Sequence, residues 1–236
     1  MHYGRIVEAR FIKRPNRFIA HCLADGEEVI AHVRNTGRCR ELLLPGVTVY
    51  LEAASNPERK TAYSLIGVMK GQRLINMDSS APNKVFLEAL KTGAVSLPGW
   101  GGSVREALMI KPEAVFGNSR FDFYLEEAGK KAFIEVKGVT LEREGAAYFP
   151  DAPTQRGIKH LEELMTARSE GYEAYVVFVV QMKGVAFVSP NDSTHPAFGE
   201  TLRKVSRNGV GVLCWDCQVE PGTLLLADRV PVKLEY

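Results

Sequence analysis

The segment from residue 119 to residue 137 constrains the fold most, because two alternating runs flank a single two-residue turn, Ala128-Gly129. Alternation with a period of two is typical of β-strands, and a two-residue loop joins antiparallel neighbours. This turn predicts a register in which one face of the hairpin carries only apolar pairs: Phe121–Val136, Phe123–Ile134 and Leu125–Ala132. A slip of one residue would send the apolar side chains of one strand to the wrong face, so the pattern supports this register.

The other face of the predicted hairpin carries charge. Asp122 is expected opposite Glu135, and Lys137 follows two residues later on the same face. Opposed carboxylates repel each other, and a divalent cation between them reverses that effect. Carboxylate oxygens suit Mg²⁺, which takes one or two protein carboxylates together with water and phosphate oxygens, and Mn²⁺ is the alternative.

The charged face therefore predicts a metal site. Lys137 would orient an attacking water or stabilise negative charge on a phosphate. An exposed ion-pair cluster, with Lys137 neutralising the two acids, is the other interpretation of the same residues.

The first 76 residues contain short alternating runs separated by turn signals. We expect strands over residues 5–12, 17–23, 28–33, 47–53, 62–69 and 73–76. Turn signals at this spacing are typical of an all-β unit. Five or six strands in so short a segment favour an oligonucleotide-binding (OB) barrel, which closes at least partly and so hides its strand edges.

Beyond residue 80 the pattern changes to helices that alternate with strands. We expect helices over residues 84–91, 154–169 and 197–207, and strands over residues 174–180, 185–188 and 210–214. Helices that flank a mixed sheet indicate an α/β unit. The predicted architecture is thus a two-domain α+β protein, with an OB-like domain over residues 1–80 and a mixed-sheet α/β domain over residues 81–236.

Charge differs between the two predicted units. Residues 1–76 hold 12 Lys and Arg against 7 Asp and Glu, whereas the remainder holds 18 against 21. A basic unit beside an acidic one suggests a surface for a polyanion next to a site that gathers carboxylates. No apolar run is long enough to span a bilayer and the N-terminus lacks the pattern of a signal peptide, so we expect a cytoplasmic protein with no membrane partner.

The four cysteines indicate packing rather than a disulfide framework. Cys214 and Cys217 form a lone C-x-x-C motif, for which zinc would need two further ligands nearby. The surrounding residues look like strand, so the two sulfurs should point to opposite faces. A free cysteine behaves as a small hydrophobe, and we favour that role over metal or redox chemistry.

The order Asp, hairpin, Glu-x-Lys resembles the PD-(D/E)-x-K nuclease core of type II restriction enzymes and Holliday junction resolvases, with Phe121 in the place of the proline. The whole chain resembles the sugar fermentation stimulation protein A family. The motifs that carry this resemblance run almost from end to end and include Asn35-Thr36-Gly37, Pro82-Asn83, Glu88-Ala89-Leu90, Asp122-Phe123, Glu135-Val136-Lys137, Phe149-Pro150-Asp151-Ala152, Arg156-Gly157 and Lys159-His160-Leu161.

The resemblance implies an OB-like domain, a nuclease-like domain, and DNA binding linked to the regulation of sugar metabolism. It also implies that Glu88 joins Asp122 and Glu135 as a metal-linked carboxylate from the first helix of the nuclease-like domain. From the sequence alone, Glu88 equally suits a solvated position at the flank of an apolar helix face.

Two clusters of cations are candidates for nucleic-acid contact. In the first domain, Phe11 and Phe18 flank a cationic turn, and single-strand binders combine positive grooves with aromatic rings. We expect both rings in the core and assign DNA contact to Lys13, Arg14, Arg17, Arg34 and Arg38. In the second domain, the predicted helix opens with Arg156, Lys159 and His160, where cations and backbone N–H groups would hold phosphate; an ordinary polar helix face is the alternative.

These features favour a DNA-binding protein with little sequence specificity and a magnesium-dependent phosphodiester hydrolase centre. Its partner would be single- or double-stranded DNA, and a homo-oligomer is compatible with the sequence. A noncatalytic DNA-binding regulator of sugar (maltose) metabolism is the alternative function. A sugar-binding effector has no separate support in the residues.

Overall fold

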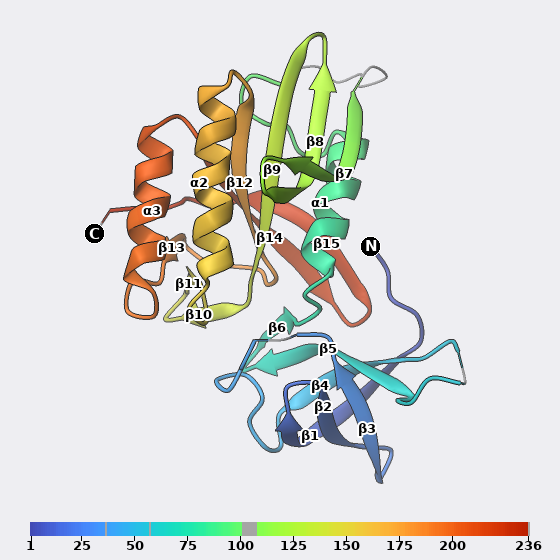
Figure 1. The fold of residues 1–236 in the computed structure, drawn as a ribbon. Coiled ribbons are helices and arrows are strands. Elements are labelled where there is room, and N and C mark those ends of the chain that lie inside the picture. Colours follow the sequence, from blue (N-terminus) through green and yellow to red (C-terminus); the bar gives the residue numbers. More distant parts are fainter. Residues whose placement is uncertain (36, 57, 101–107, 236) are drawn as a thin grey trace.

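The computed structural model describes residues 1–35, 37–56, 58–100 and 108–235 and contains two lobes, which Figure 1 shows one above the other. The lower lobe is a β-barrel built from β1 (Ile6–Asn16), β2 (Ile19–Ala24), β3 (Glu27–Val33), β4 (Thr48–Ala53), β5 (Tyr63–Lys70) and β6 (Arg73–Asn76). The strand order is β3-β2-β1-β4-β5-β6. A parallel pairing of β3 with β5 closes the first five strands into a barrel, as an OB fold requires.

The upper lobe is an α/β unit around a mixed six-stranded sheet of order β15-β14-β12-β9-β8-β7. These strands are β7 (Met109–Phe116), β8 (Ser119–Glu127), β9 (Lys130–Val139), β12 (Glu173–Val180), β14 (Gly211–Glu220) and β15 (Thr223–Arg229). β9, β12 and β14 run parallel to one another, and antiparallel strands flank them on both sides. A small sheet of β10 (Leu141–Arg143), β11 (Ala146–Phe149) and β13 (Val188–Pro190) lies beside this core.

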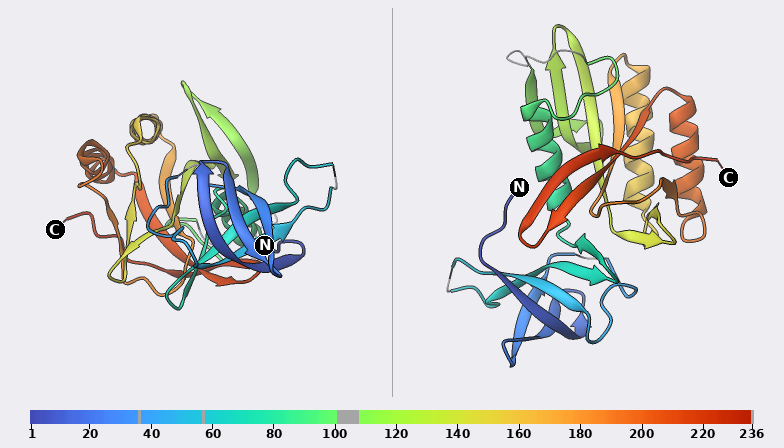
Figure 2. Two further views of the ribbon diagram at one scale, coloured as in Figure 1. Left: turned by 90° about the horizontal axis from the view of Figure 1, so that it is seen from below. Right: turned by 180° about the vertical axis from the view of Figure 1, so that it is seen from behind.

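Helices cover both faces of the large sheet (Figures 1 and 2). On one face lies α1 (Ala81–Thr92), and on the other lie α2 (Gln155–Ser169) and α3 (Pro196–Arg207). Two signals in the sequence explain where α1 begins and ends: Pro82 occupies its first turn, and Gly93 caps its C-terminus with a left-handed φ of 72°. The Thr154 hydroxyl caps α2 by accepting the N–H of Gly157 at 3.0 Å.

The two lobes meet through buried polar contacts at the end of β6. The Gln181 side chain follows β12 and donates to Asn76 Oδ1 and to the Asp78 carbonyl, each at 2.9 Å. Nearby, Glu142 accepts from Lys70 at 2.6 Å and pairs with Arg73 at 3.1 Å. Because buried polar groups without partners are costly, these contacts fix how the barrel sits against the α/β unit.

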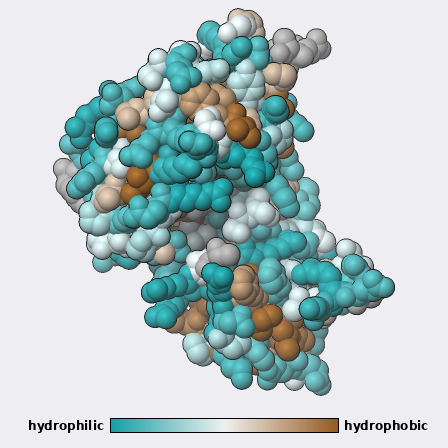
Figure 3. Space-filling view, viewed as in Figure 1, coloured by the Kyte–Doolittle hydropathy of each residue, from teal (hydrophilic) through white to brown (hydrophobic). Residues whose placement is uncertain are grey.

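The surface is mostly hydrophilic on the face drawn in Figure 3, with smaller hydrophobic areas on both lobes. Phe18 is 43% exposed, so its expected place in the barrel core is wrong, whereas Phe11 is 3% exposed and confirms the expectation. No helix of the described part of the chain is long and apolar enough to cross a membrane.

Candidate metal centre and nucleic-acid surface

The hairpin of β8 and β9 forms in the predicted register over most of its length. The ladder runs from Glu127–Lys130 to Phe123–Ile134, with Ala128 and Gly129 at positive φ in the turn. The two strands carry the three residues of the predicted charged site, namely Asp122 on β8 and Glu135 and Lys137 on β9.

The predicted register fails at the far end of the hairpin. Phe121 packs against Phe133 at 5.4 Å between ring centroids, under α2, whereas Phe123 packs against Phe86 of α1 on the opposite face. The two rings were expected on one face, and that expectation is wrong. The reason lies at Asp122, between them: its carboxylate Oδ2 accepts the backbone N–H of Val136 at 2.7 Å, so a side chain interrupts the regular ladder.

Glu135 is the most deeply buried member of the site, at 4% exposure. Its Oε1 accepts from Nζ of Lys137 and from Nδ1 of His160, each at 2.5 Å. Its Oε2 is buried and has no hydrogen-bond partner. Burial alone raises the pKa of Glu135, but the hydrogen bond from His160 and the charge of Lys137 outweigh it and hold the pKa below its ordinary value.

The contacts of His160 determine its tautomer. A guanidinium group can only donate, and Nε of Arg156 lies 3.3 Å from Nε2 of His160, so Nε2 is the acceptor. The ring proton therefore lies on Nδ1, from which it is donated to Glu135. The prediction that His160 contacts nucleic acid is corrected, because its side chain is 7% exposed and faces the carboxylate. Arg156 and Lys159 remain exposed at the start of α2.

Asp122 is held by groups that sequence reasoning did not assign to the site. Its Oδ1 accepts from the Asn83 side-chain amide of α1 at 2.6 Å. Burial and the negative charge of Glu135 raise the pKa of Asp122 to about 6. The sequence offered two signals for Asn83: its place directly after Pro82 in the first turn of α1, and the Pro82-Asn83 pair among the motifs of the resemblance.

Glu88 does not reach these residues. Its side chain is 55% exposed and pairs with the amino group of Met1 at 2.7 Å. Asn83 and Glu88 are five residues apart on α1, which turns them to different sides of the helix. The structure thus does not bring Glu88 to Asp122 and Glu135, and the α1 residue that contacts Asp122 is Asn83.

Asp122 and Glu135 carry carboxylate oxygens, the ligand atoms that a hard divalent cation prefers. Among the described residues, no three His, Cys, Asp or Glu side chains gather closely enough to hold a metal ion by themselves. Two carboxylates are nevertheless the usual protein contribution to a magnesium site, in which water and phosphate oxygens complete the coordination. The unpartnered Oε2 of Glu135 supplies one free ligand atom.

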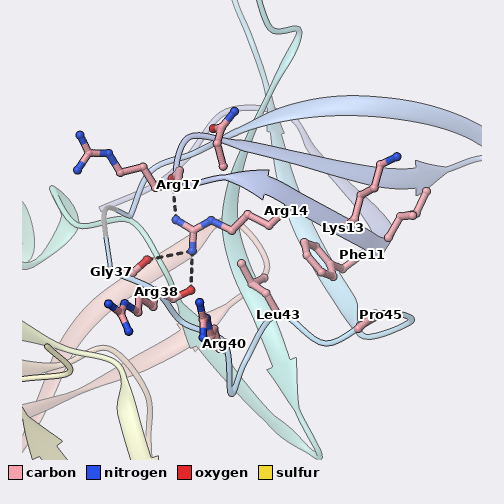
Figure 4. Close-up of a pocket in the computed structure, with 11 residues that line it drawn as sticks. Phe11, Lys13, Arg14, Arg17, Gly37, Arg38, Arg40, Leu43 and Pro45 are labelled. Carbon is pink, nitrogen blue, oxygen red and sulfur yellow. Dashed lines mark hydrogen bonds between the residues drawn. The ribbon is translucent and has the colours of Figure 1, made fainter. Parts of the chain in front are cut away.

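The barrel carries a pocket of about 600 Å³ that is lined by cations (Figure 4). Its lining consists of Phe11, Ile12, Lys13, Arg14, Asn16, Arg17, Gly37, Arg38, Arg40, Leu43 and Pro45. Five of these residues are basic and none is acidic. The structure thus brings together four of the five cations of the barrel that were predicted to contact DNA.

Arg14 and Arg34 have structural roles. The Arg14 guanidinium donates to the carbonyls of Arg17, Asn35, Gly37 and Arg38 at 2.6–2.9 Å. Arg34 lies outside the pocket lining and pairs with Glu52 at 3.0 Å and with the buried Asp78 at 3.1 Å. Internal carbonyl oxygens accept from both terminal nitrogens of Arg14, and carboxylate oxygens of Glu52 and Asp78 accept from Nη1 of Arg34, so these contacts compete with the predicted contact to DNA.

The cysteines pack as predicted. Cys214 and Cys217 are free, fully buried and belong to the apolar clusters on opposite faces of the sheet. Burial raises the pKa of the Cys217 thiol to about 12, which suppresses thiolate chemistry.

Comparisons with known proteins match both lobes. Residues 12–77 match the family model described as the SfsA N-terminal OB domain, and residues 80–223 match the sugar fermentation stimulation protein RE domain. A sugar fermentation stimulation protein homolog of Desulfitobacterium hafniense (strain DSM 10664 / DCB-2) is 56% identical over 234 residues, which cover 99% of each chain. The homolog of Clostridium beijerinckii is 51% identical over 99% of this chain and 100% of its own.

A solved structure shares the whole fold. The structure of Pyrococcus furiosus SfsA in complex with Ca²⁺ aligns with a TM-score of 0.87 and 26% identity, over 99% of this chain and 98% of that one. The likeness covers the barrel and the α/β unit together. It confirms the predicted fold class of an OB-like barrel followed by a mixed-sheet α/β domain.

Proposed function

The chain belongs to the sugar fermentation stimulation protein (SfsA) family, and from that premise we propose that it binds DNA and hydrolyses phosphodiester bonds with the help of a divalent cation. Asp122, Glu135 and Lys137 form the proposed hydrolytic centre. The cations of the barrel and of the start of α2 form the proposed DNA surface.

The observation that carries the proposal is the unpartnered Oε2 of Glu135. A buried polar atom without a partner costs about 1–3 kcal/mol, and a cation would remove that cost. Asp122 lies close enough for the charge of Glu135 to raise its pKa, so a cation would also relieve the repulsion between the two carboxylates. The related P. furiosus protein was solved with Ca²⁺, which prefers the oxygen ligands that Mg²⁺ prefers.

Each residue of the centre has a defined part in the proposed chemistry. Asp122 and Glu135 would hold the cation, which when bound supplies positive charge to the scissile phosphate and lowers the pKa of water. Lys137 contacts Glu135 with one of its three N–H bonds and can offer another to a phosphate oxygen. His160 and Asn83 keep the two carboxylates in place, which preserves the geometry that hydrolysis requires.

The cations of the DNA surface favour contact with the phosphate backbone. Lys13, Arg17, Arg38 and Arg40 line the pocket of the barrel, and Arg156 and Lys159 are exposed on α2. Cations of this kind neutralise phosphates in any sequence, so affinity should depend on salt more than on base composition.

Incubation with supercoiled plasmid tests the proposal. Wild type should nick or linearise the plasmid with Mg²⁺ or Mn²⁺ and leave it intact with a chelator. An Asp122→Asn variant should retain the plasmid in a gel-shift assay without cutting it. If wild type retains DNA but cuts neither the plasmid nor branched or single-stranded DNA with either cation, the hydrolase is refuted, and a noncatalytic regulator of sugar metabolism becomes the function to test.

A further inference from the structure

The pocket of the barrel is lined by five basic residues and by no acidic one; Asp151 lies beside the lining residue Gly37 but forms no ion pair with a described residue. Arg38 and Arg40 are exposed and make no side-chain hydrogen bond or ion pair with the described residues. Figure 4 shows both side chains on the loop that borders the pocket, across from Lys13 and Arg17 of the β1–β2 hairpin. Cations that line one pocket and form no ion pair there favour an anionic ligand.

The loop that carries Arg38 and Arg40 is attached to the barrel by a buried side chain and by hydrogen bonds. Cys39, between them, is 2% exposed and has a positive φ of 46°, so it anchors the loop in the core. Arg14 binds the carbonyls of Gly37 and Arg38 from the other side. The two arginines therefore start from a fixed backbone, which lowers the entropy cost of binding.

Apolar and aromatic side chains in and beside the pocket provide contact surface for a planar group such as a DNA base. The lining includes the apolar residues Ile12, Leu43 and Pro45. Phe18 is not a lining residue, but it follows Arg17 in the chain, is 43% exposed, and has its ring centroid 4.7 Å from the Arg17 guanidinium carbon. Cations combined with an exposed ring are typical of surfaces that hold single-stranded nucleic acid, whose bases are free to stack.

The pocket adjoins the start of α2. A Cβ placed on Gly37, in the pocket lining, would lie 2.5 Å from Oδ2 of Asp151, so the loop packs directly against the segment that leads into α2. From there Arg156 reaches His160, and His160 reaches Glu135. In Figure 1 the end of α2 that follows β11 points toward the barrel.

We infer that this pocket holds a single-stranded segment of DNA and delivers it past the start of α2 to Asp122 and Glu135. The inference rests on the proposed function and narrows its substrate to DNA that contains a single-stranded part, such as an overhang or a flap. A continuous blunt duplex keeps its bases stacked inside and cannot offer them to the rim of the pocket.

Binding measured by fluorescence anisotropy with a chelator present tests the inference without cleavage. The probes are a labelled 12-nucleotide oligothymidylate, a blunt duplex of the same length, and unlabelled dTMP as a competitor. The test variant is Arg38→Ala with Arg40→Ala. The control variant, Arg5→Ala with Lys60→Ala, removes the same charge from exposed positions of the barrel outside the pocket.

The test variant should bind the oligothymidylate roughly 10- to 30-fold more weakly at 0.1 M salt, with a shallower salt dependence, because each lost phosphate contact on a single strand lowers the slope by about 0.7. The control variant should differ from wild type by less than threefold, and wild type should prefer the oligothymidylate to the duplex. Equal losses in the two variants, or a preference for the duplex, would overturn the inference. Competition by dTMP at low micromolar concentration would also overturn it and indicate a free-nucleotide site.

Cleavage then separates this inference from the proposed function. If wild type binds the single strand more tightly than the duplex and the test variant loses this preference, but wild type cuts no DNA with Mg²⁺, the hydrolase activity is refuted and the single-strand site is supported. If wild type cuts blunt duplex and overhang DNA at the same rate, and the test variant cuts both at the wild-type rate, the single-strand site is refuted and the hydrolase activity is supported.

Discussion

The Nδ1 atom of His160 lies 2.5 Å from Oε1 of Glu135, and neither side chain is more than 7% exposed. This contact comes from α2 and occupies Oε1, whereas Oε2 of Glu135 is left without a partner. Arg156 completes the arrangement by binding the opposite nitrogen of the imidazole, which leaves the ring proton on the side of Glu135. His160 is therefore a positioning residue for the carboxylate.

Replacing His160 tests that role. We expect His160→Ala to weaken Mn²⁺ binding by about 10- to 100-fold, because residues that orient a metal ligand have effects of this size. His160→Asn should recover most of the affinity, since its amide nitrogen can donate where Nδ1 donates. Titration calorimetry gives the affinity, and circular dichroism checks the fold. Wild-type affinity in a folded His160→Ala protein would contradict the role.

Replacing Asp122 and replacing Lys137 should have different effects on cation affinity. Asp122→Asn removes one negative charge from the metal site, so cation affinity and cleavage should both collapse while DNA binding survives. Lys137→Ala spares both carboxylates and should slow cleavage with less effect on the cation. The measurements are Mn²⁺ affinity and single-turnover cleavage rate. Cleavage by Asp122→Asn at the wild-type rate would rule out the centre.

Glu88 supplies the matched control for that pair, because it is a carboxylate on α1 whose partner is the Met1 amine. We expect Glu88→Gln to leave cation affinity and cleavage rate within twofold of wild type. A loss as large as that of Asp122→Asn would show that Glu88 moves to the site when the cation binds.

Arg14 and Arg17 should separate stability from DNA binding. Arg14→Ala removes hydrogen bonds to four backbone carbonyls and should lower the free energy of unfolding by about 2 kcal/mol or more. Arg17→Ala should change that free energy by less than about 0.5 kcal/mol and weaken DNA binding. Urea denaturation and anisotropy measure the two effects. Equal stability of both variants would contradict the structural role of Arg14.

Glu142 should make the stability of the protein depend on acid pH. Burial alone raises its pKa, but the hydrogen bond from Lys70 and the charge of Arg73 outweigh burial and hold the pKa below its ordinary value. A lowered pKa means that the stabilisation is complete above about pH 4.3 and is lost as the pH falls through the folded-state value. Glu142→Gln should cost about 1–3 kcal/mol near pH 7. Its melting temperature should also vary less than that of wild type between pH 5 and pH 3.

Cys214 and Cys217, which are free thiols, should prove dispensable for binding DNA and the cation. The double variant Cys214→Ser, Cys217→Ser should keep its affinity for DNA and for Mn²⁺ and lose stability, because each hydroxyl enters an apolar core. In wild type, a thiol reagent should modify these residues only as fast as the protein unfolds. Stoichiometric zinc that disappears in the double variant would refute the packing role.

The local sequence pattern by itself determined the strand pairing around the hairpin turn, the faces of the strands and the barrel. The alternation around Ala128-Gly129 predicts the observed pairing of Phe123 with Ile134, because a strand repeats every two residues whatever surrounds it. The same rule places Cys214 and Cys217 on opposite faces of β14. Turn residues at short intervals predict the barrel, and the basic composition of the first 76 residues predicts a surface for anions.

Tertiary structure alone decided which polar groups work together. Asn83 meets Asp122 from 39 residues away, and His160 meets Glu135 from 25 residues away. Neither separation along the chain produces a periodic pattern in the sequence, because the two contacts depend on how α1 and α2 pack on opposite faces of the sheet. The same holds for Arg14, whose charge predicts a ligand contact until folding places four carbonyls around it. The charge of a side chain follows from its residue type, but the group that it binds depends on how the folded chain packs.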